Sequence, residues 1–116
     1  MLEVGRRRRN QPAPPPVVFD ALVGPARGWL VLLDDEVEPR VLEADAPHWL
    51  SWSSLWAKRP EAIVRFELPY DGSGQGTDLC WTLLVGEPAP EAAWIGHARK
   101  RLNQLINADL RYTFGQ

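Results

Sequence analysis

The sequence predicts an α+β fold in which an antiparallel sheet and one long C-terminal helix pack together in two layers. Three observations lead to this class. Residues 90–114 show a helical repeat of apolar side chains, residues 37–85 alternate apolar and polar positions as strands do, and turn-rich connections separate those strands. Short connections make neighbouring strands antiparallel, which leaves one apolar sheet face for the helix to cover.

The C-terminal stretch, residues 90–114, is predicted to form a helix about 36 Å long, at about 1.5 Å per residue. Pro90 suits its first turn, and Gly115 marks its end. With successive residues placed about 100° apart, most of its apolar side chains fall on one stripe. The stripe consists of Trp94, Ile95, Ala98, Leu102, Leu105, Ile106 and Tyr112. Asp109 projects from the middle of this stripe, while the opposite side is charged and rich in amides.

The N-terminal residues 1–14 are interpreted as a short strand over residues 2–8 followed by a proline-rich connector. Residues 15–23 fit a two-turn helix, because proline suits its first position and a glycine–proline pair follows it. The apolar residues 27–33 are expected to form a second helix, although periodicity does not separate helix from buried strand in so short a run. The sequence therefore predicts two short helices near the N-terminus.

Four stretches in the middle of the chain are predicted to be strands: residues 37–43, 49–56, 63–68 and 77–85. The first contains a proline, which suits an edge strand, and the last two are joined by a turn-rich hairpin. The bulkier face of each later strand is placed inward. The inward residues are Leu50, Trp52, Ser54 and Trp56, then Val64, Phe66 and Leu68, then Leu79, Trp81, Leu83 and Val85.

Length and composition predict one soluble domain over residues 1–116, since a chain of this size buries a single core. No apolar run approaches the ~18 residues of a membrane span, and no apolar segment follows the charged N-terminus as in a secretory signal. The single cysteine, Cys80, excludes an internal disulfide and fits a reducing compartment, so a cytoplasmic location is expected. A net charge of -2 argues against a general polyanion binder.

Several motifs occur in an order that is typical of a known family. PPPVVFDALVGP at residues 14–25 is followed by GQGTDLCWTLL at residues 74–84 and then by the long terminal helix. This order resembles the START-like (SRPBCC) superfamily, whose members include polyketide cyclases, aromatases, lipid-transfer domains and many bacterial proteins. The G-x-G-T-x-L strand of that family is matched by Gly74, Gly76, Thr77 and Leu79.

The resemblance implies a helix-grip fold, in which a curved antiparallel sheet wraps around the C-terminal helix and leaves an apolar cavity between them. Members of the family generally have a longer chain and more strands than the four or five expected here. The size of the cavity in this shorter chain is therefore the observation that would best separate a binding protein from one with a filled core.

Tryptophans are the strongest indication of a site. Aromatic side chains of the sheet and of the terminal helix would converge between the layers, either as core or as the wall of an apolar pocket. The predicted ligand-binding residues are Trp52, Ser54, Trp56, Phe66, Trp81, Leu83, Trp94, Leu102, Ile106 and Asp109. The expected ligand is an apolar, aromatic or lipid-like small molecule.

Asp109 is the residue with the clearest chemical interest, because a carboxylate on an apolar stripe is costly unless it is paired. It is either structural, accepting hydrogen bonds from neighbours, or a pocket acid that orients a ligand or transfers a proton. No second acid or base can be identified, so Asp109 is only a weak candidate for a catalytic residue and no other is assigned.

Metal and cofactor chemistry is not expected. The two histidines, His48 and His97, have no ligand cluster around them and are interpreted as surface residues. Cys80 lies on the opposite face from its strand neighbours Leu79 and Trp81, and inert packing is favoured. The glycine-rich GSGQG joins two strands and lacks a following lysine, so it is a hairpin turn and not a phosphate loop.

Four consecutive arginines, Arg6–Arg9, form the densest basic run. Such a run could contact nucleic acid or anionic lipid, but the acidic chain and the absence of interleaved aromatic residues make nucleic acid an unfavoured partner. The favoured alternative is that arginines on an edge strand discourage pairing with other chains. A homodimer is left open.

Three functions are therefore considered. The leading hypothesis is a small-molecule binding protein with an apolar pocket between sheet and C-terminal helix. The second is a cyclase- or aromatase-like enzyme that uses Asp109 as a pocket acid. The third is an interaction domain without a ligand, in which a collapsed cavity leaves the sheet edge or the basic helix face for a partner.

Overall fold

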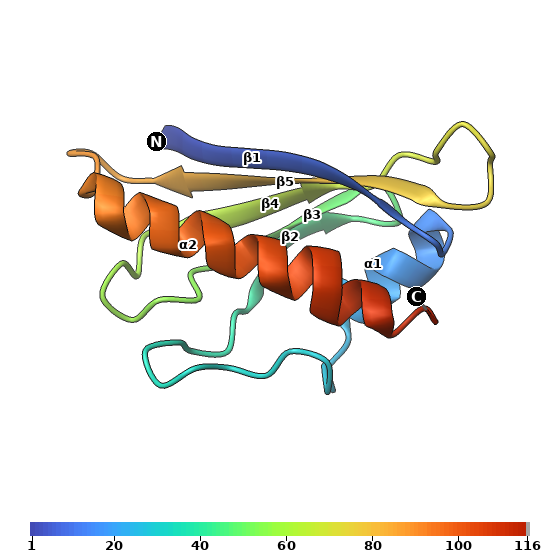
Figure 1. The fold of residues 1–116 in the computed structure, drawn as a ribbon, viewed down its shortest axis with the longest axis horizontal. Coiled ribbons are helices and arrows are strands. Elements are labelled where there is room, and N and C mark those ends of the chain that lie inside the picture. The colour runs from blue at the N-terminus through green and yellow to red at the C-terminus, as the bar shows by residue number, and fades with distance from the viewer. Residues whose placement is uncertain (116) are drawn as a thin grey trace.

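A five-stranded antiparallel sheet forms one layer of the protein, and the C-terminal helix packs along it as the other (Figure 1). The structure is a computed structural model and describes residues 1–115. The strands lie in the order β1-β5-β4-β3-β2, so β1 and β2 are the two edges. Their bounds are β1 Leu2–Gln11, β2 Val41–Asp45, β3 Trp49–Ser53, β4 Ile63–Glu67 and β5 Thr77–Val85.

Helix α1, Pro15–Val23, lies at one end of the sheet, and the C-terminal helix consists of α2, Ala92–Gln104, and η1, Leu105–Leu110. The predicted α+β class is confirmed, and the bounds of α1 and β5 coincide with the prediction. The predicted inward residues of the last three strands form the core with α1 and α2, because they are all buried. No helix within residues 1–115 is both long and apolar enough to cross a membrane.

The prediction of a second short helix over residues 27–33 is wrong. This stretch contains no helix. It has one hydrogen-bonded turn, in which the Leu30 amide donates to the Arg27 carbonyl at 2.9 Å. Its apolar side chains alternate in burial: Leu30 is buried, whereas Val31 and Leu33 are exposed. Period-two burial belongs to an extended chain, and the short apolar run could not be distinguished from a helix in the sequence.

Several strand ends also differ from the prediction: β1 continues to Gln11 instead of residue 8, β2 ends at Asp45 instead of residue 43, and β4 ends at Glu67 instead of residue 68. Strand β2 begins at Val41 instead of residue 37, because Pro39 has no amide hydrogen to donate to a ladder. Strand β3 ends at Ser53, because the Ser54 hydroxyl accepts a hydrogen bond from the Trp56 amide at 2.9 Å and closes a local turn. Leu55, predicted on the outer face, is consequently fully buried.

The C-terminal helix changes its geometry part of the way along. It is an α-helix to Gln104 and then a π-helix, η1, over the next six residues. A π-helical turn, with i→i+5 hydrogen bonds, holds one more residue than an α-helical turn. Each later residue therefore takes the direction that its predecessor would have in an α-helix, a rotation of roughly 100° about the helix axis. Leu110 therefore occupies the buried stripe, and Tyr112, predicted to lie in it, is 77% exposed.

Strand β1 and helix α2 are in close contact at Gly5. A Cβ atom at this glycine would lie 2.8 Å from Cγ of Arg99 and 3.2 Å from Cζ3 of Trp81. Only a residue without a side chain therefore fits between the strand and the helix at this point. This contact fixes the separation of the two layers along the β1 edge.

Candidate functional site

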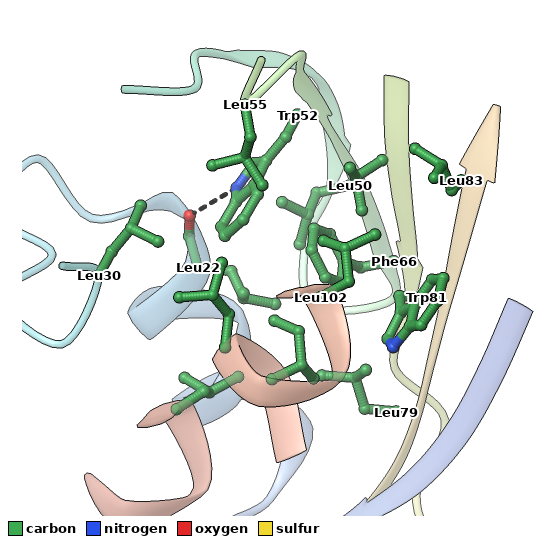
Figure 2. Close-up of a cluster of buried hydrophobic side chains, with 14 of the residues drawn as sticks. Leu22, Leu30, Leu50, Trp52, Leu55, Phe66, Leu79, Trp81, Leu83 and Leu102 are labelled. Carbon is green, nitrogen blue, oxygen red and sulfur yellow. Dashed lines mark hydrogen bonds between the residues drawn. The ribbon is translucent and has the colours of Figure 1, made fainter. Parts of the chain in front are cut away.

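Most of the predicted ligand-binding residues face the interior between sheet and C-terminal helix, and Figure 2 shows Trp52, Phe66, Trp81, Leu83 and Leu102 there. Nine of the ten lie on the sheet or helix surfaces that face this interior, and eight of those are buried. The buried ones are Trp52, Ser54, Trp56, Phe66, Trp81, Leu83, Leu102 and Ile106, while Trp94 is half-buried at the rim. The protein's own side chains thus pack this interior.

Aromatic contacts hold the interior together. The rings of Trp52 and Phe66 meet edge to face with centroids 4.7 Å apart, and those of Trp56 and Trp94 do so at 5.3 Å. Trp29 stacks on Trp52 at 6.1 Å. Such pairs contribute about 0.5–1.5 kcal/mol each beyond the burial of their area. Sequence reasoning missed Trp29, although the alternation of the run that contains it would have favoured an extended, partly buried segment.

Five buried polar atoms have no hydrogen-bond partner among the described residues. They are Nε1 of Trp56, Nε1 of Trp81, Oε1 of Gln11, Nε of Arg27 and Oδ1 of Asn107. By contrast, Nε1 of Trp52 donates to the Leu22 carbonyl at 3.0 Å, and Nε2 of Gln11 donates to the Ile106 carbonyl at 2.9 Å. Buried polar groups are normally satisfied, so each orphaned atom is a place where a ligand or a water molecule would gain a hydrogen bond.

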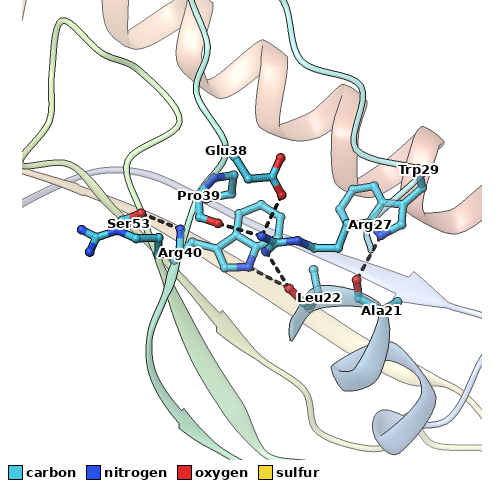
Figure 3. A network of polar contacts seen from close by, with 9 residues as sticks. Ala21, Leu22, Arg27, Trp29, Glu38, Pro39, Arg40 and Ser53 are labelled. Carbon is cyan, nitrogen blue, oxygen red and sulfur yellow. Dashed lines mark hydrogen bonds and ion pairs between the residues drawn. The ribbon is translucent and has the colours of Figure 1, made fainter. Parts of the chain in front are cut away.

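Residues 24–40, here called the covering segment, lie across one side of this interior. Its Arg27 donates to the Leu22 carbonyl at 3.1 Å and to the Pro39 carbonyl at 2.7 Å, and it pairs with Glu38 at 2.9 Å (Figure 3). Nε1 of Trp29 donates to the Ala21 carbonyl at 3.0 Å. Because side chains make these contacts, the segment is held in place without regular secondary structure.

One buried ion pair joins the covering segment to the helix. Arg101 of α2 binds both carboxylate oxygens of Glu36, at 2.7 Å and 2.9 Å, and also donates to the Val31 carbonyl at 2.6 Å. The two side chains are 4% and 0% exposed. Glu36 also accepts from the Leu33 amide at 2.9 Å, so the carboxylate is well satisfied. Two-point contact between a guanidinium and a carboxylate is both strong and geometrically specific.

Asp109 does not lie in the apolar stripe. The extra residue of η1 turns it toward the rim, where it is half-buried, and Leu110 takes the buried position. Within residues 1–115 its side chain makes no hydrogen bond and no ion pair. The expectation that Asp109 projects from the middle of the stripe assumed an unbroken α-helix, and that assumption fails at Leu105.

Several shallow hollows open on the surface. One of them has a volume of about 180 Å³ and lies between the covering segment and the end of β3. It is lined by Val37, Glu38, Arg40, Ser53, Ser54, Trp56, Ala57 and Pro60. Two of the predicted ligand-binding residues, Ser54 and Trp56, therefore border this hollow as well as the core.

The remaining reactive groups have unremarkable surroundings. Burial raises the pKa of the Cys80 thiol, so little thiolate is present at neutral pH. His97 lies at the surface, 3.7 Å from Asp35, and His48 is exposed. No group of three or more histidine, cysteine or acidic side chains within residues 1–115 is arranged to hold a metal ion.

Comparisons with known proteins show which solved structures have a similar fold. No family model matches the sequence, and no curated protein matches it. Solved structures do match, all at low identity. CalU16 from Micromonospora echinospora is 17% identical, with a TM-score of 0.67 over 88% of this chain and 70% of that one. The Aha1 dimer from Colwellia psychrerythraea is 11% identical, with a TM-score of 0.67 over 93% and 92%.

A third match, Ara h 8.0201, is 12% identical, with a TM-score of 0.58 over 97% of both chains. At these identities the likeness concerns the fold, and it covers nearly the whole of this chain in each case. The sheet with its long C-terminal helix is what these structures share with it. The chain thus has the fold of the START/Bet v1-like (SRPBCC) superfamily, in agreement with the resemblance of its sequence motifs.

Proposed function

We propose that the protein binds an apolar or aromatic small molecule between the sheet and the C-terminal helix, beneath the covering segment. The fold is consistent with a protein that binds hydrophobic ligands. The observation that carries the proposal is that three of the orphaned polar atoms, on Trp56, Trp81 and Gln11, lie in a largely apolar interior. A mainly apolar ligand with one or two polar atoms would satisfy those that it reaches, and such a ligand fits the usual chemistry of small-molecule sites.

Space for the ligand has to come from the covering segment. Leu30 is its deeply placed side chain, 7% exposed and packed with the core, and Trp29 stacks on Trp52 beside it. Withdrawal of these two side chains would vacate the volume of a small aromatic molecule without breaking a strand or a helix. The hollow beside Ser54 and Trp56 marks the side from which the ligand would enter.

The proposal predicts that shortening Leu30 improves binding. The Leu30→Ala variant enlarges the interior by about three methylene-sized groups, so a ligand no longer has to displace them. The matched control is Val31→Ala, because Val31 is the next residue of the same segment and is 67% exposed. The probe is anilinonaphthalene sulfonate, followed by its own emission and by quenching of the protein's tryptophan fluorescence.

The expected result is saturable binding of one probe per protein, tighter in Leu30→Ala than in the natural protein and unchanged in Val31→Ala. Bound probe should also raise the unfolding temperature, because a ligand of the folded state stabilises it. Near-ultraviolet circular dichroism checks that each variant keeps fixed packing, since loosened proteins bind such dyes nonspecifically. Absence of saturable binding at micromolar concentrations in both the natural protein and Leu30→Ala would refute the proposal.

A further inference from the structure

Strand β1 presents an open edge of the sheet. It is ten residues long, pairs with β5 on one side, and is the last strand in the sheet order (Figure 1). Within the described residues, Arg111 donates to the Asn10 carbonyl at 2.6 Å, near the end of the strand. No other hydrogen bond of the described residues reaches the backbone of Glu3–Arg9 from outside the ladder with β5. Every second backbone group of this stretch therefore points outward and is free to pair.

The four arginines of β1 divide between the two faces of the sheet. Gly5 lies against Arg99 of α2, and Gln11 bonds to Ile106 of η1, so the alternating positions between them face the helix. These positions are Arg7 and Arg9. Arg6 and Arg8 lie on the outer face, because they alternate with these residues and pair with Thr82 and Cys80 of β5, which belong to that face.

The two faces differ in the acids that accompany the arginines. On the outer face Arg6 pairs with Glu3 at 3.7 Å, and Glu3 and Glu67 both lie near enough to affect Cys80. On the helix face, Arg7 and Arg9 are exposed and take part in no ion pair of the described residues, and two further cations border the strand there. Those cations are Arg99, beside Gly5, and Arg111, beside Asn10. Positive charge is therefore least compensated on the helix face of the edge.

We propose that the β1 edge binds an extended acidic peptide segment of a partner protein, which adds to the sheet as a sixth strand. The backbone of the partner would pair with the free N–H and C=O groups, and its carboxylates would face Arg7 and Arg9. A strand alternates its side chains between two faces, so a peptide with an acid at every second residue places all of them on the helix face. This proposal is independent of the apolar interior.

Charge decides between the occupants of this edge. A second β1 strand would set arginine against arginine, which is unfavourable in directly opposed pairs. Nucleic acid is disfavoured because the edge carries no aromatic side chain on which bases could stack, and the chain as a whole has a net charge of -2. An acidic strand uses both the hydrogen-bonding edge and the charge, whereas each other occupant uses only one of them.

The test measures fluorescence anisotropy of a labelled peptide as long as β1, in which glutamate alternates with threonine. A second peptide has proline in place of every threonine, so it has the same charge but lacks the amide hydrogens that a strand needs. Two double variants are compared, R7Q/R9Q and R6Q/R8Q. Both remove two charges from the same exposed strand, so they are matched in net charge and differ only in the face.

The expected result is that the glutamate–threonine peptide binds one-to-one and the proline peptide does not. R7Q/R9Q should weaken binding by roughly tenfold and R6Q/R8Q by less than about threefold, since opposed charge pairs across strands contribute up to about 1 kcal/mol each. Circular dichroism checks that both variants stay folded. The proposal is overturned if the two peptides bind equally, if the two variants lose equal affinity, or if a double-stranded oligonucleotide competes better than the peptide. Concentration-dependent self-association abolished by R7Q/R9Q would also overturn it, in favour of a second copy.

Discussion

Removing one partner of the Arg101–Glu36 pair should destabilise the protein strongly. The guanidinium and the carboxylate are 4% and 0% exposed, so either variant, Arg101→Met or Glu36→Leu, leaves a buried charge without its counter-charge. Such a loss costs about 3–5 kcal/mol. Unfolding entropy is about 2.1 cal mol⁻¹ K⁻¹ per residue, hence about 0.24 kcal mol⁻¹ K⁻¹ for 116 residues. The midpoint of thermal unfolding should therefore fall by roughly 12–20 °C.

The double variant Arg101→Met/Glu36→Leu provides the decisive comparison. It replaces the pair with apolar side chains of similar size, and such replacements are often neutral or stabilising. Its unfolding midpoint, measured by circular dichroism, should lie well above that of either single variant. The exposed pair Arg6–Glu3, with atoms 3.7 Å apart, is the control, and Glu3→Gln should change stability by no more than about 1 kcal/mol. A double variant that loses the sum of the two single losses would refute the reasoning.

Three further predictions concern the strand–helix contact, the π-helix and the β4–β5 turn. Gly5→Ala should lower the free energy of unfolding by about 1–3 kcal/mol through overpacking. The control Gly96→Ala should raise it by about 1 kcal/mol, because a methyl group there meets nothing within 4 Å and alanine favours helix. Chemical denaturation measures both changes. Deleting the exposed Ala108 should turn η1 into ordinary α-helix, with the buried stripe still in register. The variant should therefore still unfold cooperatively on heating, and a non-cooperative transition would contradict this reasoning. Hydrogen bonds, first from the Ser73 hydroxyl, lower the pKa of Asp71 from 3.8 to about 2. This contribution to stability is complete above pH 3.8 and is lost as pH falls toward 2, and in Ser73→Ala the midpoint of Asp71, followed by NMR, should move up toward 3.8.

Sequence patterns predicted the elements that have long, regular repeats. Strand β5 has an apolar residue at every second position from Leu79 to Val85, and α1 begins with prolines and is followed by a glycine, so both were bounded correctly. The convergence of Trp52 and Trp81 with the C-terminal helix also followed, because the inward face of each strand is fixed by its alternation. The local pattern was strong enough in these cases to determine the packing.

Two features of the site had no local signal. The sequence carries no pattern that marks the π-helix, which begins at Leu105 and whose Ile106 carbonyl accepts from the Gln11 amide. A helical wheel at constant angle therefore misplaced Asp109 and Tyr112. The covering segment is held by side chains from distant parts of the chain, above all by Arg101. Contacts between residues far apart in sequence leave no periodicity, and a single sequence does not reveal them.

The pairing of β1 with β5 also sets the order in which the protein can form during its synthesis. Strand β1 is made before the other strands of the sheet, but its partner among the described residues, β5, starts at Thr77, after the rest of the meander. At about 5–20 residues per second, β1 waits for several seconds with both of its edges open. Four adjacent arginines repel the same segment of neighbouring nascent chains during this interval, so they protect the strand before it folds.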